Sequence, residues 1–242
     1  MVTRYLVLAA FAACVVAPCT AALSATSPSS AAAPAETEHL QYLDPAEFAP
    51  THLLPPPPPR GSLVEAQELA NLKAIIAAAT PQRLAQAKAD GDLEEPAVFN
   101  AAAGIDIAKL PATKALLDII QEETEQVSDS GKLYFARVRP YGIDPTLPHC
   151  GNGGNAAKSY PSGHAGFAWS VGWALVRLIP DKAEAIVARA QDYAFSREVC
   201  GVHFASDIEA SHVIGALVAE RLLADPRLAA RLAAARAELA AH

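Results

Sequence analysis

The chain has 242 residues and a formal net charge of −7; 52% of its residues are hydrophobic and 19% are charged. This composition is too apolar for a disordered chain and has no collagen-like glycine repeat, and the length allows one domain with a sizeable core. The acidic balance disfavours broad electrostatic binding of nucleic acid or anionic membranes, but it leaves room for a local cluster of cations.

Residues 1–22 have the pattern of a secretory signal peptide. Arg4 supplies a positive start, and an apolar stretch covers residues 5–17. This stretch is shorter than the roughly 18 residues that a membrane span needs. We therefore expect export, cleavage and no membrane attachment afterwards. A signal anchor and a lipoprotein signal are the alternatives, but Cys14 and Cys19 each fit a lipobox poorly.

Residues 23–60 are rich in alanine, serine and proline, and they end in the run Pro55–Pro59. Consecutive prolines cannot continue a helix or a central strand, so this segment is expected to be an extended arm. A proline-rich ligand for a partner protein is the alternative. We interpret the segment as a stiff arm that lies along its own domain.

From residue 61 to 242 the pattern predicts a single all-α domain, a helical bundle with no sustained strand alternation. Ser62 and Thr80 are expected to cap the first two helices, and Pro111 opens the third. The expected helices are 62–79, one beginning at Thr80, one beginning at Pro111, 163–179, one capped by Asp181 and ending near Phe195, 204–224, and a last one capped by Asp225.

Signal cleavage would leave two cysteines, Cys150 and Cys200. An even number of cysteines in an oxidising compartment predicts one disulfide. Two unrelated buried thiols are the alternative. A bridge between these residues would connect the loop after Arg139 to the segment between Arg197 and His203.

The segment 159–164 is typical of a helix start that binds an anion. Free backbone N–H groups and the positive end of the helix dipole attract an oxyanion there, and Gly163 lets it come close. Ser162 can add a hydroxyl donor, and His164 lies at the edge of the same site. An ordinary helix cap with a surface histidine is the alternative.

The segment 196–207 contains a histidine and an aspartate four residues apart, His203 and Asp207, which one helical turn can bring together. A carboxylate bonded to one imidazole nitrogen fixes the tautomer and leaves the other nitrogen free to attack. Arg197 can present its planar fork to phosphate oxygens. An exposed ion pair on a helix is the alternative.

The segment 132–140 supplies two more candidate cations, Lys132 and Arg139, although a solvated basic face would look the same. Arg137 is interpreted as a surface charge. The region 91–110 contains no motif that we can use.

In chain order the three segments read Lys-x6-Arg-Pro, Pro-Ser-Gly-His and Ser-Arg-x5-His-x3-Asp. This order resembles the signature of the phosphatidic acid phosphatase type 2 superfamily, which also contains the vanadium haloperoxidases. The signal peptide, the Leu-Leu-Pro-Pro-Pro-Pro arm, Arg-Val-Arg-Pro-Tyr and Ser-Arg-Glu-Val-Cys-Gly-Val-His are similar to bacterial class A non-specific acid phosphatases. The resemblance covers the chain from about Tyr42 onwards.

The resemblance implies an all-helical, periplasmic, metal-independent enzyme that acts on small phosphomonoesters, requires no cofactor and forms a homo-oligomer. It implies the following roles: phosphate binding by Lys132, Arg139, Ser162, Gly163 and Arg197, nucleophilic attack by His203, orientation of that histidine by Asp207, and proton transfer by His164.

Three other functions are compatible with these residues. A vanadate-dependent haloperoxidase would bind vanadate at the same site, but those enzymes are usually much longer. A lipid phosphatase would be expected to have membrane spans. A non-catalytic phosphate-binding protein would leave the nucleophile and the proton donor without a role. Transfer of the phosphoryl group to an alcohol instead of water is compatible with the acid phosphatase hypothesis, as a side reaction of the same enzyme.

Overall fold

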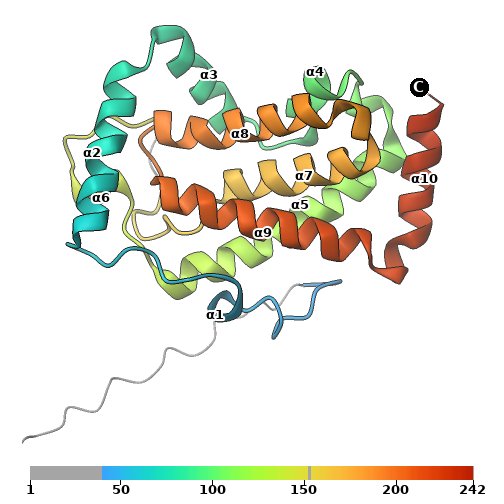
Figure 1. Ribbon diagram of the computed structural model, residues 1–242, viewed down its shortest axis with the longest axis horizontal. Coiled ribbons are helices and arrows are strands. Elements are labelled where there is room, and N and C mark those ends of the chain that lie inside the picture. The colour runs from blue at the N-terminus through green and yellow to red at the C-terminus, as the bar shows by residue number, and fades with distance from the viewer. Residues whose placement is uncertain (1–39, 152–153, 242) are drawn as a thin grey trace, which may run out of the picture. The chain divides into compact units, whose positions relative to one another are not determined.

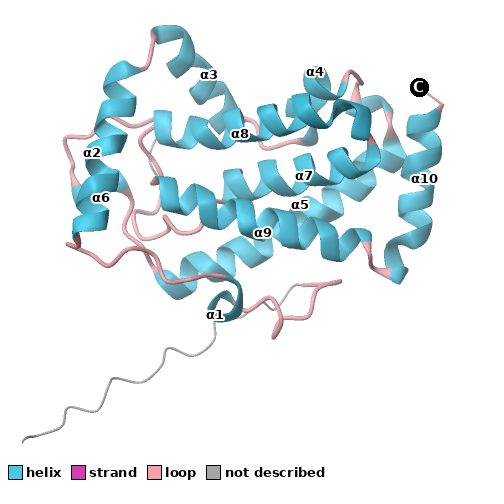
Figure 2. Ribbon diagram, in the orientation of Figure 1, coloured by secondary structure: helices cyan, strands magenta, loops and turns pink. Residues whose placement is uncertain are grey.

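Every regular element of the protein is helical in the part of the chain that the structure describes (Figures 1 and 2). The computed structural model describes residues 40–151 and 154–241, and it has no strand within them. The predicted all-α class is therefore confirmed. The signal-peptide prediction concerns residues 1–22, which lie outside the described residues. Among the described helices, none combines the length and the apolar character needed to cross a membrane.

Helix α7 (Gly163–Leu178) is the central element and is buried on most of its faces. It packs mainly against α9 (Ala205–Leu223), α8 (Ala183–Val199) and α5 (Pro111–Phe135), which surround it in Figure 1. A Cβ atom on Gly215 of α9 would lie 2.7 Å from the backbone nitrogen of Ser170 in α7. Glycine therefore lets these two helices approach backbone to backbone.

The other helices cover this core from outside. They are α1 (Pro50–Leu53), α2 (Leu63–Ala78), α3 (Pro81–Asp92), α4 (Asn100–Ala103), α6 (Pro140–Ile143) and α10 (Ala229–Ala240), with 3-10 turns at Pro96–Phe99, Ile107–Lys109, Pro180–Lys182 and Pro226–Leu228. Helices α2 and α3 pack against α8, and α10 packs against α5.

Side-chain caps fix several of the helix starts. The Ser62 hydroxyl accepts a hydrogen bond from the Glu65 amide, the Thr80 hydroxyl accepts one from Arg83, and the Asp225 carboxylate caps the 3-10 turn before α10. The predicted caps at Ser62 and Thr80 are confirmed. The prediction that Asp225 caps the last helix is confirmed only for the 3-10 turn, because the N-cap residue of α10 is Leu228, which makes no side-chain bond. The prediction that Asp181 caps α8 is wrong, because a 3-10 turn precedes that helix and its N-cap residue makes no side-chain bond.

The described part of the N-terminal arm packs onto the helices. Leu43 and Phe48 are buried in the main core, and Glu123 of α5 accepts a hydrogen bond from the Leu43 amide at 3.2 Å. The Tyr160 hydroxyl donates to the Pro55 carbonyl at 2.8 Å, which holds the start of the proline run. A domain boundary at residue 61 stays a prediction.

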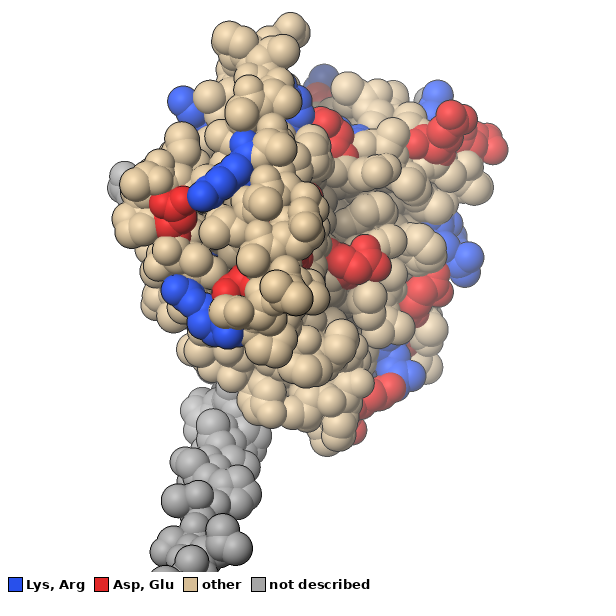
Figure 3. Space-filling view, turned by 60° about the vertical axis from the view of Figure 1, so that its left-hand side comes forward, with Lys and Arg blue, Asp and Glu red and all other residues tan. Residues whose placement is uncertain are grey.

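Charged side chains lie scattered on the face drawn in Figure 3, where lysine and arginine occur near aspartate and glutamate. Most of this face is uncharged, in keeping with the low charged fraction of the chain. No continuous basic surface covers the described residues visible in that view.

Candidate active site

A cavity of about 560 Å³ lies where α3, α5, α7 and α8 converge. Six of the eight residues predicted to bind or transfer phosphate line it: Lys132, Arg139, Gly163, His164, Arg197 and His203. The other two, Ser162 and Asp207, are fully buried outside the cavity lining. The three sequence segments, up to 75 residues apart, thus meet in one place.

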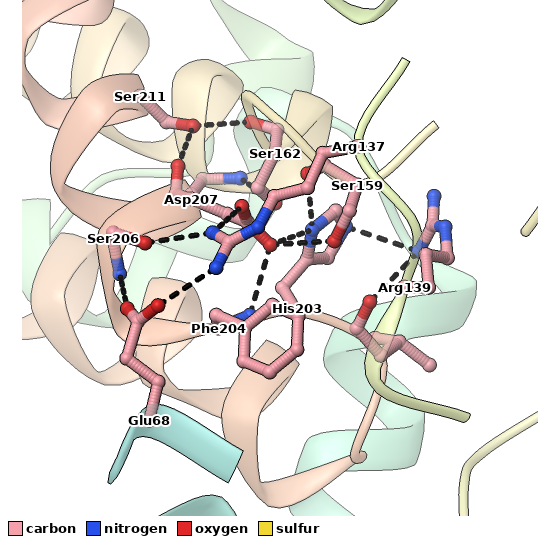
Figure 4. Close-up of polar contacts among 12 residues, drawn as sticks. Glu68, Arg137, Arg139, Ser159, Ser162, His203, Phe204, Ser206, Asp207 and Ser211 are labelled. Atoms are coloured by element: carbon pink, nitrogen blue, oxygen red, sulfur yellow. Dashed lines mark hydrogen bonds and ion pairs between the residues drawn. The ribbon is translucent and has the colours of Figure 1, made fainter. Parts of the chain in front are cut away.

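His203 is buried and has a defined orientation (Figure 4). Its Nδ1 atom lies 2.8 Å from the Ser159 carbonyl oxygen and 3.3 Å from Asp207 Oδ2. A carbonyl oxygen only accepts hydrogen bonds, so Nδ1 carries the proton and Nε2 keeps its lone pair. Burial lowers the pKa of His203 well below its usual range, and Arg139 and Arg197 lower it further. The ring is therefore a neutral imidazole whose unprotonated Nε2 accepts a hydrogen bond from Arg139 Nη1 at 3.1 Å.

Asp207 is surrounded by donors. Its Oδ1 accepts from the Arg137 guanidinium at 2.6 Å, and its Oδ2 accepts from the Ser159 hydroxyl at 2.6 Å and the Phe204 amide at 2.9 Å. Burial raises the pKa of Asp207, and the Arg137 charge and the Ser159 hydroxyl bond oppose that rise. The carboxylate is thus held beside His203 from several sides.

The interpretation of Arg137 as a surface charge is wrong. Its side chain is only 4% exposed and bridges Asp207 to Glu68 of α2, with a distance of 2.7 Å to Glu68 Oε2. Glu68 also accepts from the Ser206 amide at 2.9 Å, so it links α2 to the start of α9 (Figure 4). The sequence signal for Arg137 was its alternation with Arg139. Nothing in the sequence pointed to Glu68.

Arg197 has two buried nitrogens without a partner in the described part of the chain. It is 9% exposed, yet its Nε and Nη1 atoms have no hydrogen-bond partner among the described residues, and the residue lines the cavity. Buried donors are rarely left unpaired, so an orphaned guanidinium beside a cavity marks a place for an anion. A Cβ atom on Gly91 would lie 2.5 Å from Nη1, which explains why glycine occupies that position.

Two further cations, Arg139 and Lys132, line the same cavity. The Arg139 Nη1 atom lies 3.1 Å from His203 Nε2, and it also donates to the Val202 carbonyl. The Lys132 ammonium pairs with Asp129 at 2.7 Å, and a Cβ atom on Gly163 would lie 2.9 Å from its Nζ. Lysine and the N-terminus of α7 therefore face the same space, and both attract negative charge.

His164 contacts the end of α3 and the loop after it. Its Nε2 lies 3.2 Å from the Gly91 carbonyl oxygen, and its Nδ1 lies 3.4 Å from Glu94 Oε2. Burial and the charge of Arg197 lower the pKa of His164 to about 3. Burial and the Glu125 charge raise the pKa of Glu94. Gly91 and Glu94 belong to the region 91–110, where the sequence carried no usable motif.

The predicted disulfide between Cys150 and Cys200 is confirmed, with a Cα–Cα distance of 4.9 Å. The Cys150 amide also donates to the Cys200 carbonyl at 2.9 Å. The bridge therefore fastens the loop after α6 to the end of α8, between Arg197 and His203.

Within residues 40–151 and 154–241, no group of three or more histidine, cysteine, aspartate or glutamate side chains is arranged to hold a metal ion. The polar lining of the cavity consists of cations, a helix N-terminus, two histidines and carboxylates. Fold and site together define an all-helical protein with a cavity in which three cations surround a buried histidine.

Comparisons with known proteins agree with this class. Residues 112–227 match the model of the PAP2 superfamily. The acid phosphatase of Zymomonas mobilis is 34% identical over 191 residues, which cover 75% of this chain and 69% of that protein. The non-specific acid phosphatase of Providencia stuartii is 29% identical over 197 residues, covering 78% and 79%. The chain belongs to the PAP2 superfamily, as a phosphatase of the class A acid phosphatase type.

Proposed function

We propose that this protein is a periplasmic, metal-independent acid phosphatase that hydrolyses a broad range of phosphomonoesters through a phosphohistidine intermediate. The observation that carries the proposal is that one cavity holds both a neutral His203, whose unprotonated Nε2 lies 3.1 Å from Arg139 Nη1, and Arg197, whose buried Nε and Nη1 atoms are unpaired among the described residues. One group can attack phosphorus, and the other can hold its oxygens.

In the first step His203 Nε2 attacks phosphorus as the bond to the leaving oxygen breaks on the opposite side. Arg139, Arg197, Lys132 and the N-terminus of α7 stabilise the charge on the three equatorial oxygens, because they are fixed in place before the reaction. Asp207 and the Ser159 carbonyl keep the Nδ1 proton in place and stabilise the positive ring that forms.

His164 gives a proton to the leaving alkoxide and later takes one from the water that attacks the phosphohistidine. Water then cleaves the nitrogen–phosphorus bond and releases phosphate with His203 neutral again. In the structure His164 faces Gly91 and Glu94, and its lowered pKa keeps it deprotonated. Its role therefore requires the negative phosphoryl group to offset Arg197, and the ring to turn toward the leaving oxygen. An alcohol in place of water gives phosphotransfer.

The test measures hydrolysis of a chromogenic phosphomonoester from pH 4 to 8 in excess chelator, for wild type, His203→Ala and His212→Ala. His212 stacks on Trp169 outside the cavity, so it provides a matched histidine control. We expect chelator-resistant activity in wild type and in His212→Ala, and none in His203→Ala. Alkaline quenching should trap phosphate on the wild type and on His212→Ala, but not on His203→Ala. Chelator-sensitive activity, or an active His203→Ala, would contradict the mechanism.

A further inference from the structure

The floor and the mouth of the active-site cavity carry opposite charges. Lys132, Arg139 and Arg197 are half-buried or buried around His203, and they form the floor. Asp92 at the end of α3 and Glu125 on α5 are exposed residues that line the same cavity, and Glu94 lies partly buried beside them. Among the described residues that line the cavity, Lys88 is the one exposed cation.

The reaction geometry decides which part of the substrate meets each set of charges. In-line transfer places the leaving oxygen on the side of phosphorus opposite the attacking nitrogen. His203 attacks from the buried floor, so the leaving group extends toward the mouth. The transferred phosphoryl group is thus surrounded by cations, and the rest of the substrate lies among the carboxylates.

We propose that Asp92 and Glu125 are specificity-determining residues: they favour phosphomonoesters with a cationic or uncharged leaving group over those whose leaving group carries a carboxylate or a second phosphate. The inference rests on the proposed function, since it assumes that the floor binds the transferred phosphoryl group. A unit charge acting across a water-lined mouth changes the rate ratio by roughly two- to fivefold, and salt screens the effect.

The experiment compares kcat/KM for three substrates of similar size: phosphoethanolamine, glycerol 3-phosphate and 3-phosphoglycerate, whose leaving groups are positive, neutral and negative. It uses wild type, Asp92→Asn, Glu125→Gln and the double variant at one pH, in low and high salt. We expect the rate ratio of 3-phosphoglycerate to phosphoethanolamine to rise about fivefold or more in the double variant at low salt. That rise should shrink in high salt. Glu94 is left unchanged because it contacts His164.

Two further variants test whether the effect reverses with the sign of the charge and whether it is confined to the cavity mouth. Lys88→Gln removes the opposite charge from the mouth, so it should lower the same ratio. Glu184→Gln is the matched control, because Glu184 lies in the first turn of α8, at the opposite end of that helix from Arg197. An unmoved ratio in the double variant, or an equal rise in Glu184→Gln, would overturn the inference. A wild type inactive on all three substrates would instead overturn the proposed function, and this inference with it.

Discussion

At the scale of single residues, the site is marked by the contrast between satisfied and unsatisfied buried groups. Both carboxylate oxygens of Asp207 accept hydrogen bonds from buried neighbours, whereas Arg197 leaves two of its nitrogens unpaired. Leaving a buried charged donor unpaired is costly, so the protein tolerates it where a ligand completes the bonds. The space in front of Arg197 depends on a residue with no side chain, Gly91.

Replacing Gly91 by alanine should therefore weaken phosphate binding without harming the fold. The new Cβ atom would lie 2.5 Å from Arg197 Nη1 and would push the guanidinium aside. Losing one charge-assisted hydrogen bond corresponds to roughly a tenfold or larger rise in KM and in the inhibition constant of inorganic phosphate. Alanine is a better helix former than glycine, so the unfolding temperature should stay level or rise. An unchanged inhibition constant for phosphate would refute this role.

Arg137 is predicted to act as a positioning residue through Asp207. Arg137→Met removes the charge that lowers the pKa of Asp207, so this carboxylate will take up its proton at higher pH. The acid limb of kcat should then move to higher pH, and each unit of that shift lowers the rate about tenfold at a fixed pH on the limb. KM should change little, because Arg137 does not line the cavity.

Three comparisons separate this role from a purely structural one. Losing the partner of a buried carboxylate costs about 3–5 kcal/mol of stability, so Arg137→Met needs a folding check by circular dichroism. Arg137→Lys keeps the charge and should restore much of the wild-type pH profile. Glu68→Gln removes only the far partner of Arg137 and should shift the profile less. A limb that stays in place in folded Arg137→Met would mean that the arginine only supports the fold.

At the scale of helices, the sequence predicts the elements whose ends are set by local features such as capping residues, prolines and apolar runs. The sequence predicts helices at residues 62–79 and 204–224, and the structure has α2 at Leu63–Ala78 and α9 at Ala205–Leu223. The start of α7 was also predictable, because Pro161 and the Ser162 cap precede an apolar run. The short helices α1 and α6 were not predicted, since four-residue turns depend on tertiary packing more than on propensity.

The same limit applies to the candidate site. Its nucleophile, its cations and the helix start were recognised because they lie in short segments with defined spacing. Glu68 and Gly91 were missed because each reaches the site only through contacts with residues more than 60 positions away. Such roles arise from the packing of α2 and α3 against α8, which no local pattern encodes.

The disulfide links the loop after α6 to the end of α8. Its removal is predicted to lower both stability and activity. Cys150 and Cys200 are 50 residues apart, and in the chain-entropy model a loop of that length contributes about 4 kcal/mol. The double variant Cys150→Ala/Cys200→Ala should unfold at lower denaturant concentration. Its kcat/KM should fall several-fold, since the bridge positions the segment before His203. A reductant should reproduce this in wild type and leave the double variant unchanged. Full activity and stability after complete reduction would contradict it.

At the scale of the whole molecule, the net charge of −7 coexists with three cations around His203 in one cavity, and this combination links ligand binding to protons. The pKa of His164 is about 3 in the fold, against 6.5 for the unperturbed side chain. Between these two pH values His164 is protonated in the unfolded chain but deprotonated in the folded protein. Stability therefore falls as pH drops through that window, by up to about 1.4 kcal/mol per pH unit for one such group. His203 acts in the same direction. Glu198, whose pKa is raised to about 7, acts in the opposite one.

An anion in the pocket should relieve part of this acid penalty. Sulfate keeps its double negative charge between pH 7 and 5, and by offsetting Arg197 and Lys132 it should raise the pKa of His164. The complex then takes up a proton that the empty protein does not, so the stabilisation by sulfate must grow as pH falls. The measurement is the sulfate-induced rise in unfolding temperature at pH 7, 6 and 5. Groups outside the cavity, such as Glu198, titrate equally in the samples with and without sulfate, so their effect cancels in this difference. His164→Gln should show a rise that depends less on pH, and Glu94, which also lines the cavity and has a raised pKa, accounts for the remainder. A pH-independent rise in wild type, or the same trend in His164→Gln, would show that the ligand and this histidine are not coupled.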